Sequence, residues 1–256
     1  MPIEVSRSGI ARVTINRPEM RNALDAAHLT DLEEAIRHLS GDPGVRVIVL
    51  TGEGEHFSSG ADLAEVLELS GLEAARAYFG AVAAVMAAEV EAPKPVLARV
   101  RGYCLAGATG VVAAADIVLA GEGATFGLPE IAVGLFPMVV SSLLMPLLGG
   151  RRLADLALTG RMMTAEEARG AGLVTRLVPE EDLDRIVQET AEVLARRSGE
   201  ALAAGKKALW RLATPHFAED VAWLREEIAR LATGEAARAE MRSFFERRAK
   251  GRGGKR

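Results

Sequence analysis

Short apolar runs alternate, in the first half of the chain, with longer segments whose apolar positions have helical spacing. Three runs, at residues 45–50 (VRVIVL), 96–100 (VLARV) and 116–120 (DIVLA), are rich in β-branched residues and apolar at most successive positions. Strands that are covered on both faces have this pattern, as in a parallel sheet. The runs therefore predict three buried strands.

Segments of helical length separate these strands. In residues 26–40, Leu29, Leu32, Ile36 and Leu39 fall on one helix face. Residues 72–90 predict a second helix, and the small residues of 107–115 predict a third, tightly packed one. The order strand–helix–strand–helix–strand indicates right-handed βαβ units, and residues 3–6 and 10–15 indicate a hairpin-like pair before them. We therefore expect an α/β fold.

The second half of the chain has a different pattern, which predicts almost only helices from residue 151 onward. Residues 164–167 (TAEE) have the signature of a capping box at a helix start. An apolar stripe at helical spacing follows, formed by Phe217, Val221, Leu224, Ile228 and Leu231. Such a stripe is typical of a core or a subunit interface, and we assign it no chemistry.

Composition and charge narrow the class of protein. The 256 residues are 49% apolar and 26% charged, and the net charge of −4 argues against a nucleic-acid-binding surface. The single cysteine, Cys104, excludes an internal disulfide and a cysteine-based zinc finger. Residues 131–150 carry no charge, but Pro137 and Pro146 interrupt them, which favours a buried or interface helix over a membrane span. The first nine residues lack the apolar segment of a secretion signal, and we expect a cytoplasmic protein.

Candidate chemistry lies in the glycine-rich loops that follow the three strands, at residues 51–62, 101–107 and 121–130. Ligands of α/β sheets bind beyond the carboxyl ends of the strands, and glycine lets a backbone N–H approach a ligand closely. Two loops can supply N–H donors for an oxyanion hole, and the third can supply the carboxylate of Glu130 as a general acid or base. Glycine-rich loops and a glutamate after proline are also common without any chemistry, so the pattern leaves both interpretations open.

The motifs of several other classes of enzyme are incomplete or absent. Residues 45–50 followed by Gly52 and Gly54 suggest a dinucleotide-binding fingerprint, but Phe57 stands where the third glycine is needed. Walker A, nucleophile-elbow and His-Glu-x-x-His patterns are absent from the sequence. The four histidines are scattered singly, so nothing suggests a metal.

The sequence motifs resemble those of the enoyl-CoA hydratase/isomerase (crotonase) family from about residue 3 to residue 248. Residues 16–24 (NRPEMRNAL) look like its N-terminal loop, and residues 57–63 (FSSGADL) resemble F-x-x-G-A-D-[IL]. Residues 101–110 (RGYCLAGATG), followed by Asp116, are similar to N-G-x-x-x-G-G-G-x-E…D, and residues 126–134 (FGLPEIAVG) resemble F-G-x-P-E-x-x-x-G. Residues 158–161, 168–174 and 241–248 match later segments.

The resemblance implies a fold, an activity and a set of site residues. The fold would be a ββα superhelix of repeated βαβ-type units, with a core domain at residues 1–195 and a C-terminal helical trimerisation region at 196–256. The backbone N–H groups of Ala61 and Gly107 would form the oxyanion hole of an acyl-CoA enzyme, and Glu130 would be a catalytic glutamate. The residues implied to contact coenzyme A are Met20, Arg21, Ser59, Ala61, Asp62 and Leu63. The resemblance implies no separate cofactor or metal. It implies an acyl-CoA substrate in metabolism of the fatty-acid type. Family members are typically homotrimers or homohexamers.

One position departs from the family pattern. The other glutamate of enoyl-CoA hydratases falls on Gly110, which has no side chain to ionise. Hydratases use two glutamates to position a water, whereas the 3-enoyl to 2-enoyl isomerases of the family need only one to move a proton. Hydratase and isomerase both stay open, as does an acyl-CoA-binding protein that has lost the chemistry. Glu65, Glu68 and His56 are weak candidates to replace the missing carboxylate, and Asp116 is interpreted as a structural hydrogen-bond acceptor.

Overall fold

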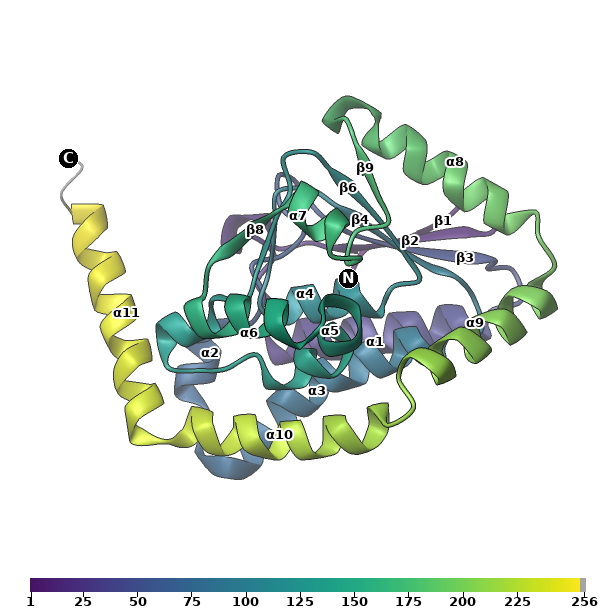
Figure 1. The fold of residues 1–256 in the computed structure, drawn as a ribbon. Coiled ribbons are helices and arrows are strands. Elements are labelled where there is room, and N and C mark those ends of the chain that lie inside the picture. The colour runs from purple at the N-terminus through teal and green to yellow at the C-terminus, as the bar shows by residue number, and fades with distance from the viewer. Residues whose placement is uncertain (254–256) are drawn as a thin grey trace.

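The structure is a computed structural model that describes residues 1–253. Within these residues the chain forms nine strands, eleven α-helices and three short 3-10 helices (Figure 1). The strands are β1 (Ile3–Val5), β2 (Ile10–Ile15), β3 (Val47–Gly52), β4 (Val96–Val100), β5 (Tyr103–Leu105), β6 (Ile117–Gly121), β7 (Thr125–Gly127), β8 (Met162–Thr164) and β9 (Arg176–Val178). The α-helices are α1 (Ala26–Gly41), α2 (Leu63–Glu68), α3 (Gly71–Glu91), α4 (Gly107–Ala114), α5 (Met138–Leu148), α6 (Gly150–Thr159), α7 (Ala165–Gly170), α8 (Leu183–Ala195), α9 (Gly199–Ala213), α10 (Phe217–Thr233) and α11 (Glu235–Gly253). The 3-10 helices are η1 (Pro18–Met20), η2 (Pro129–Val133) and η3 (Glu180–Asp182).

A six-stranded sheet forms the centre of the fold, in the order β1-β2-β3-β4-β6-β9. The β1–β2 pair is antiparallel, and the other neighbours are parallel. The three buried runs of the sequence are β3, β4 and β6, and the predicted N-terminal pair is β1 and β2. The predicted α/β class, with helices between parallel strands, is confirmed.

Both faces of this sheet are covered, which explains why its strands are apolar at successive positions. In β3, Val47 and Val49 belong to an apolar cluster that contains Leu183 and Val187 of α8. Ile48 and Leu50 point to the opposite face and join the main core, to which α1, α3 and α4 contribute. Figure 1 shows α8 on one side of the sheet and α1 and α3 on the other. Alternate residues of a strand face opposite sides of the sheet, so each face must be apolar.

A second, three-stranded sheet contains two strands, β5 and β7, that lie in the glycine-rich segments predicted as loops. Its order is β5-β7-β8, with β5 parallel to β7 and β7 antiparallel to β8. Ser58 extends this layer through a parallel bridge to Cys104. The expectation of almost only helices after residue 151 was wrong at β8 and β9, because three-residue strands are too short to show a period. The glycine-rich loops are therefore held together by backbone hydrogen bonds.

The C-terminal helices pack on the rest of the molecule. Helix α10 lies against α3 and α5, and Ile228, Ala229 and Ala232 belong to the main core. Helix α11 contacts η2, where a Cβ on Gly134 would stand 2.9 Å from the Cα of Ala237. The boundary between a core at 1–195 and a helical region at 196–256 stays a prediction. No helix in the described part of the chain has the length and apolar character to span a membrane.

Asp116 joins three elements of the fold. Its carboxylate accepts hydrogen bonds from the Val96 N–H of β4 (2.7 Å) and from the Trp210 indole of α9 (2.9 Å), and it pairs with Lys206 Nζ (2.7 Å). The Lys206 side chain is 6% exposed and also donates to the Glu89 carbonyl. The contacts agree with the interpretation of Asp116 as a structural acceptor, here for α9 as well as for the sheet.

Asp116→Ala should lower the free energy of unfolding by about 3–5 kcal/mol, because it leaves the Lys206 ammonium buried without its counter-charge. Urea denaturation followed by circular dichroism measures this loss. Asp155→Ala is the control, since it breaks an exposed pair with Arg161 and should cost less than about 1 kcal/mol. Equal losses in the two variants would contradict the anchoring role of Asp116.

Candidate active site

A cavity of about 160 Å³, partly open to solvent, lies where the segments after β3 and β5 meet η2, α5 and α10. Its walls are mostly apolar and include Phe79 and Val82 of α3, Ile228 of α10 and Phe244 of α11. Within the described residues, the only lining side chains that carry an oxygen or a nitrogen are those of Ser59 and Glu130. A single ionisable group in an apolar cavity is a candidate for acid–base chemistry.

The loop after β3 presents the N–H of Ala61 to this cavity. Leu24 and Ala61 form a parallel bridge, in which Leu24 N–H donates to Gly60 O (2.8 Å) and Asp62 N–H donates to Leu24 O (2.9 Å). In a parallel ladder the residue between two such bonds directs its own N–H and C=O to the opposite side. Ala61 lines the cavity, and its N–H has no acceptor among the described residues.

The segment between β5 and α4 presents a second free N–H, at Gly107. Gly107 is the first residue of α4, so its N–H has no acceptor within the helix. The preceding residue, Ala106, has φ 52° and ψ −129°, a conformation that costs a residue with a side chain on the order of 1–3 kcal/mol. Two bonds hold Ala106 there: its N–H donates to Gly127 O (2.9 Å), and its C=O accepts from Thr109 N–H (2.9 Å). The strained turn brings the start of α4 to the cavity.

The two loops touch each other at Gly60. A Cβ at this position would stand 2.5 Å from Leu105 O and 2.7 Å from the Cβ of Ala106, and the φ of Gly60 is +86°. The same hypothetical Cβ would lie 3.3 Å from the Gly107 nitrogen. Only glycine permits this approach, which brings the segments that carry the Ala61 and Gly107 N–H groups together.

Glu130 supplies the carboxyl group of the cavity from η2, which begins with Pro129 and is capped by Gly134 in the left-handed conformation. The residue as a whole is partly exposed, but Oε2 is buried and has no hydrogen-bond partner among the described residues. Burial raises the pKa of Glu130 to about 8, although a hydrogen bond from its own backbone N–H acts in the opposite direction. At neutral pH the group therefore holds a proton in most molecules and can exchange it.

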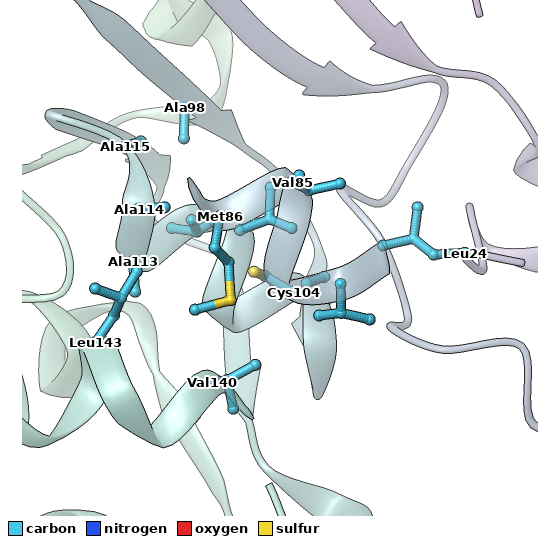
Figure 2. Packing of buried hydrophobic residues seen from close by; sticks show 14 of the residues in the cluster. Leu24, Val85, Met86, Ala98, Cys104, Ala113, Ala114, Ala115, Val140 and Leu143 are labelled. Carbon is cyan, nitrogen blue, oxygen red and sulfur yellow. The ribbon is translucent and has the colours of Figure 1, made fainter. Parts of the chain in front are cut away.

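Gly110 lies on the same face of α4 as Gly107, one turn further along, and a neighbouring helix occupies the space beside it. A Cβ at Gly110 would stand 2.3 Å from Cγ1 and 2.8 Å from Cβ of Val140 in α5, and 3.2 Å from Sδ of Met86 in α3. Figure 2 shows the Met86 and Val140 side chains in this packed region. Val140 also lines the cavity. The fold therefore leaves no room for a second carboxylate at position 110.

The structure brings together five of the predicted site residues, namely Ser59, Ala61, Leu63, Gly107 and Glu130, which all line the cavity. Three others lie outside its lining. Met20 is 46% exposed on η1, and the Arg21 guanidinium lies 5.7 Å from the centre of the Tyr103 ring. The Asp62 carboxylate binds Arg17 (2.8 Å) and caps α2 at the Ala64 N–H (3.1 Å).

The weaker candidates for a second carboxylate have other contacts. Glu65 accepts a hydrogen bond from the Ala26 N–H at the start of α1 (2.9 Å). His56 stacks on Tyr103 and accepts a hydrogen bond at Nδ1 from the Tyr103 N–H (3.2 Å). The cavity wall formed by Ile228 and Phe244 was not predicted from the sequence. The one sequence feature that related to this wall was the apolar stripe that contains Ile228. The stripe alone does not show which part of the molecule it faces.

The cavity lies beyond the carboxyl ends of parallel strands, the place where α/β proteins commonly bind their ligands. Residues 6–252 match the enoyl-CoA hydratase/isomerase family, and the chain belongs to that family. It is 34% identical to mevalonyl-coenzyme A hydratase of Aspergillus fumigatus, over 93% of this chain and 89% of that protein. An enoyl-CoA hydratase from Mycobacterium avium has a similar structure, with a TM-score of 0.83, 35% identity and coverage of 96% of both chains. An enoyl-CoA hydratase/isomerase from Xanthobacter autotrophicus Py2 has a TM-score of 0.87 and 32% identity, with coverage of 96% of this chain and 91% of that one. The predicted family and its fold are thus confirmed.

Glu130→Gln should raise the thermal stability of the protein, and by more at pH 8 than at pH 5. The pKa of Glu130 is about 8 in the folded protein, against an ordinary value of 4.5. As the pH rises between these values, the unfolded chain releases a proton that the folded protein retains, so wild-type stability falls. Glutamine does not titrate and escapes this loss.

Calorimetry of both proteins at pH 5 and pH 8 measures the difference in Tm. Glu122→Gln, on an exposed turn, is the matched control, for which we expect the same Tm difference at both pH values. A Tm difference for Glu130→Gln that does not grow with pH would show that the carboxyl is not buried as described.

Proposed function

We propose that the protein is an acyl-CoA isomerase that converts a 3-enoyl-CoA into a 2-enoyl-CoA, with Glu130 as the proton carrier. The observation that carries this proposal is the contact between Gly110 and Val140. It leaves Glu130 as the only carboxyl group of the cavity within the described residues. One carboxyl group suffices to move a proton, whereas hydration as the family performs it uses two to position a water.

In this mechanism the thioester carbonyl accepts hydrogen bonds from the Ala61 and Gly107 N–H groups. Both are free donors on segments that meet at Gly60. Negative charge develops on the carbonyl oxygen as the enolate forms, and the loss of one such donor typically costs about 2.7–4 kcal/mol of transition-state stabilisation. The position of Gly107 at the start of α4 adds the favourable end of a helix dipole.

The proton moves from C2 to Glu130 and then from Glu130 to C4. As the C2–H bond breaks, its electron pair forms a dienolate whose charge rests on the thioester oxygen. When C4 takes the proton, the double bond lies between C2 and C3, and neither water nor a cofactor is consumed. The apolar surroundings that raise the pKa of Glu130 to about 8 also make its carboxylate a stronger base for a carbon acid.

The coenzyme A moiety would extend from the cavity along the loop after β3, where Ser59, Ala61 and Leu63 belong to the cavity lining. Met20, the last residue of the neighbouring η1, and Arg21, which follows it, complete the proposed contact set. Asp62 would contribute through its backbone, because its carboxylate is bound to Arg17. We further propose a cytoplasmic homotrimer or homohexamer, as the family resemblance implies, with a role in acyl-CoA metabolism of the fatty-acid type.

A hydratase is the second candidate, and the names of the relatives favour it. The Aspergillus fumigatus and Mycobacterium avium proteins are both named as hydratases. Hydration here would require Glu130 to activate water alone, next to the apolar Val140. An acyl-CoA-binding protein without turnover is the alternative from another class, and a buried carboxyl group beside two free N–H donors is evidence against it.

The purified protein should convert a 3-enoyl-CoA to the 2-enoyl form without a change in mass, and Glu130→Gln should lower kcat by at least 10²-fold while binding stays nearly intact. Below pH 8 the wild-type kcat/KM should rise with pH, because the base must lose its proton. Mass spectrometry, an absorbance assay for the conjugated thioester and binding measurements test these expectations. Gain of one water by a 2-enoyl-CoA would instead show a hydratase, and binding without turnover would show an acyl-CoA-binding protein.

Gly110→Glu by itself should destabilise the protein severely, since its Cβ would overlap Val140. Val140→Gly removes both clashing atoms, so the double variant should be more stable than Gly110→Glu. It should also catalyse the addition of one water to a 2-enoyl-CoA. Chemical denaturation and product mass measure the two effects, with Val140→Gly as the control. Gly110→Glu as stable as the wild type would contradict the exclusion of a second carboxylate by α5.

A further inference from the structure

Tyr78 is a buried polar residue of α3 that the mechanism above does not use. The residue is 2% exposed, and its hydroxyl donates to Leu24 O (2.6 Å) and accepts from Asp62 N–H (3.2 Å). These two backbone groups belong to the bridge between Leu24 and Ala61. Among the described residues, no other side chain binds either group.

The hydroxyl therefore fixes the segment that carries the first free N–H. Asp62 follows Ala61 directly, and Leu24 is the bridge partner of Ala61. The remaining bonds of the bridge are two backbone contacts, Leu24 N–H to Gly60 O and Asp62 N–H to Leu24 O. An isolated bridge of two bonds restrains the backbone less than a full ladder does. The additional bonds to the Tyr78 hydroxyl therefore contribute strongly to fixing the direction of the Ala61 N–H.

Tyr78 also relates this segment to the wall of the cavity. Phe79 and Val82, on the same helix, line the cavity, and Met86 packs near Gly110. The Tyr78 ring lies edge-on to Phe79, with ring centres 5.4 Å apart. One helix thus sets the position of the apolar wall and, through a hydroxyl group, the position of the N–H donor opposite it.

We propose that Tyr78 is a positioning residue for the reaction, because its hydroxyl holds the Leu24–Ala61 bridge so that the Ala61 N–H points at the substrate carbonyl. This inference rests on the proposed role of the Ala61 N–H as an oxyanion donor. Tyr78 lines no part of the cavity and acts only through the backbone of its neighbours. Its loss should therefore weaken carbonyl polarisation while substrate affinity stays nearly the same.

Tyr78→Phe tests the proposal, because it removes the hydroxyl and retains the ring. We expect kcat to fall about tenfold with KM within twofold of the wild type, since a small misplacement of a donor affects the transition state more than binding. The second readout is the absorbance of bound 2,4-hexadienoyl-CoA, which shifts to longer wavelength when its carbonyl is polarised. The shift should be smaller in Tyr78→Phe than in the wild type. Saturating ligand stabilises the folded state, so this readout remains accessible in a less stable variant.

Ile36→Val is the matched control, since Ile36 is fully buried in α1 and loses one methylene without touching the site. Wild-type kcat and a wild-type spectral shift in this control, with both reduced in Tyr78→Phe, support the positioning role. A folded Tyr78→Phe variant with unchanged kcat or an unchanged shift overturns it, even if its stability falls. Failure of the proposed function is a separate result, because in that case the wild-type protein itself would not convert a 3-enoyl-CoA into the 2-enoyl form.

Discussion

The site depends on the contact of two loop segments at Gly60. A side chain there would overlap the backbone of Leu105 and the Cβ of Ala106, so the approach exists only because the residue has none. The bridges of Leu24 with Ala61 and of Ser58 with Cys104 continue this contact into a layer of short strands beside the main sheet. Two free N–H groups and the cavity between them follow from that arrangement, since each loop alone would present a single donor to solvent.

Burial of Glu130 destabilises the folded protein, but the acid–base role proposed for this residue depends on it. An unpartnered Oε2 inside an apolar cavity costs stability, because the charged form loses its water. The same desolvation raises its pKa into the range in which a carboxylate can both take and return a proton near neutral pH. The turn that carries Glu130 is held by Pro129, by Gly134 and by α11, so the C-terminal helix stabilises a group that lies far from it in the sequence.

The packing of three helices decides which side chains the cavity can contain. Helix α3 contributes Phe79 and Val82 to the wall, and Met86 and Val140 close the space beside Gly110. A core at this density does not admit a larger side chain without movement of its neighbours. Position 110 is therefore coupled to α5, and the number of carboxyl groups in the site follows from the placement of a helix as well as from the identity of one residue.

The amino-acid sequence was enough to predict the α/β class, the buried strands, the first helices and the family, because periodicity and motifs are local properties of the chain. It also pointed to Glu130, Ala61 and Gly107 through their motifs. Three-dimensional packing was needed to show that the glycine-rich loops contribute to a second sheet, that Asp62 is bound to Arg17, and that Ile228 and Phe244 complete the cavity. The same is true of Val140, which fills the space at Gly110, and of Tyr78, which holds Leu24. These contacts join residues far apart in the chain, and no local pattern encodes which distant side chain will occupy a given space.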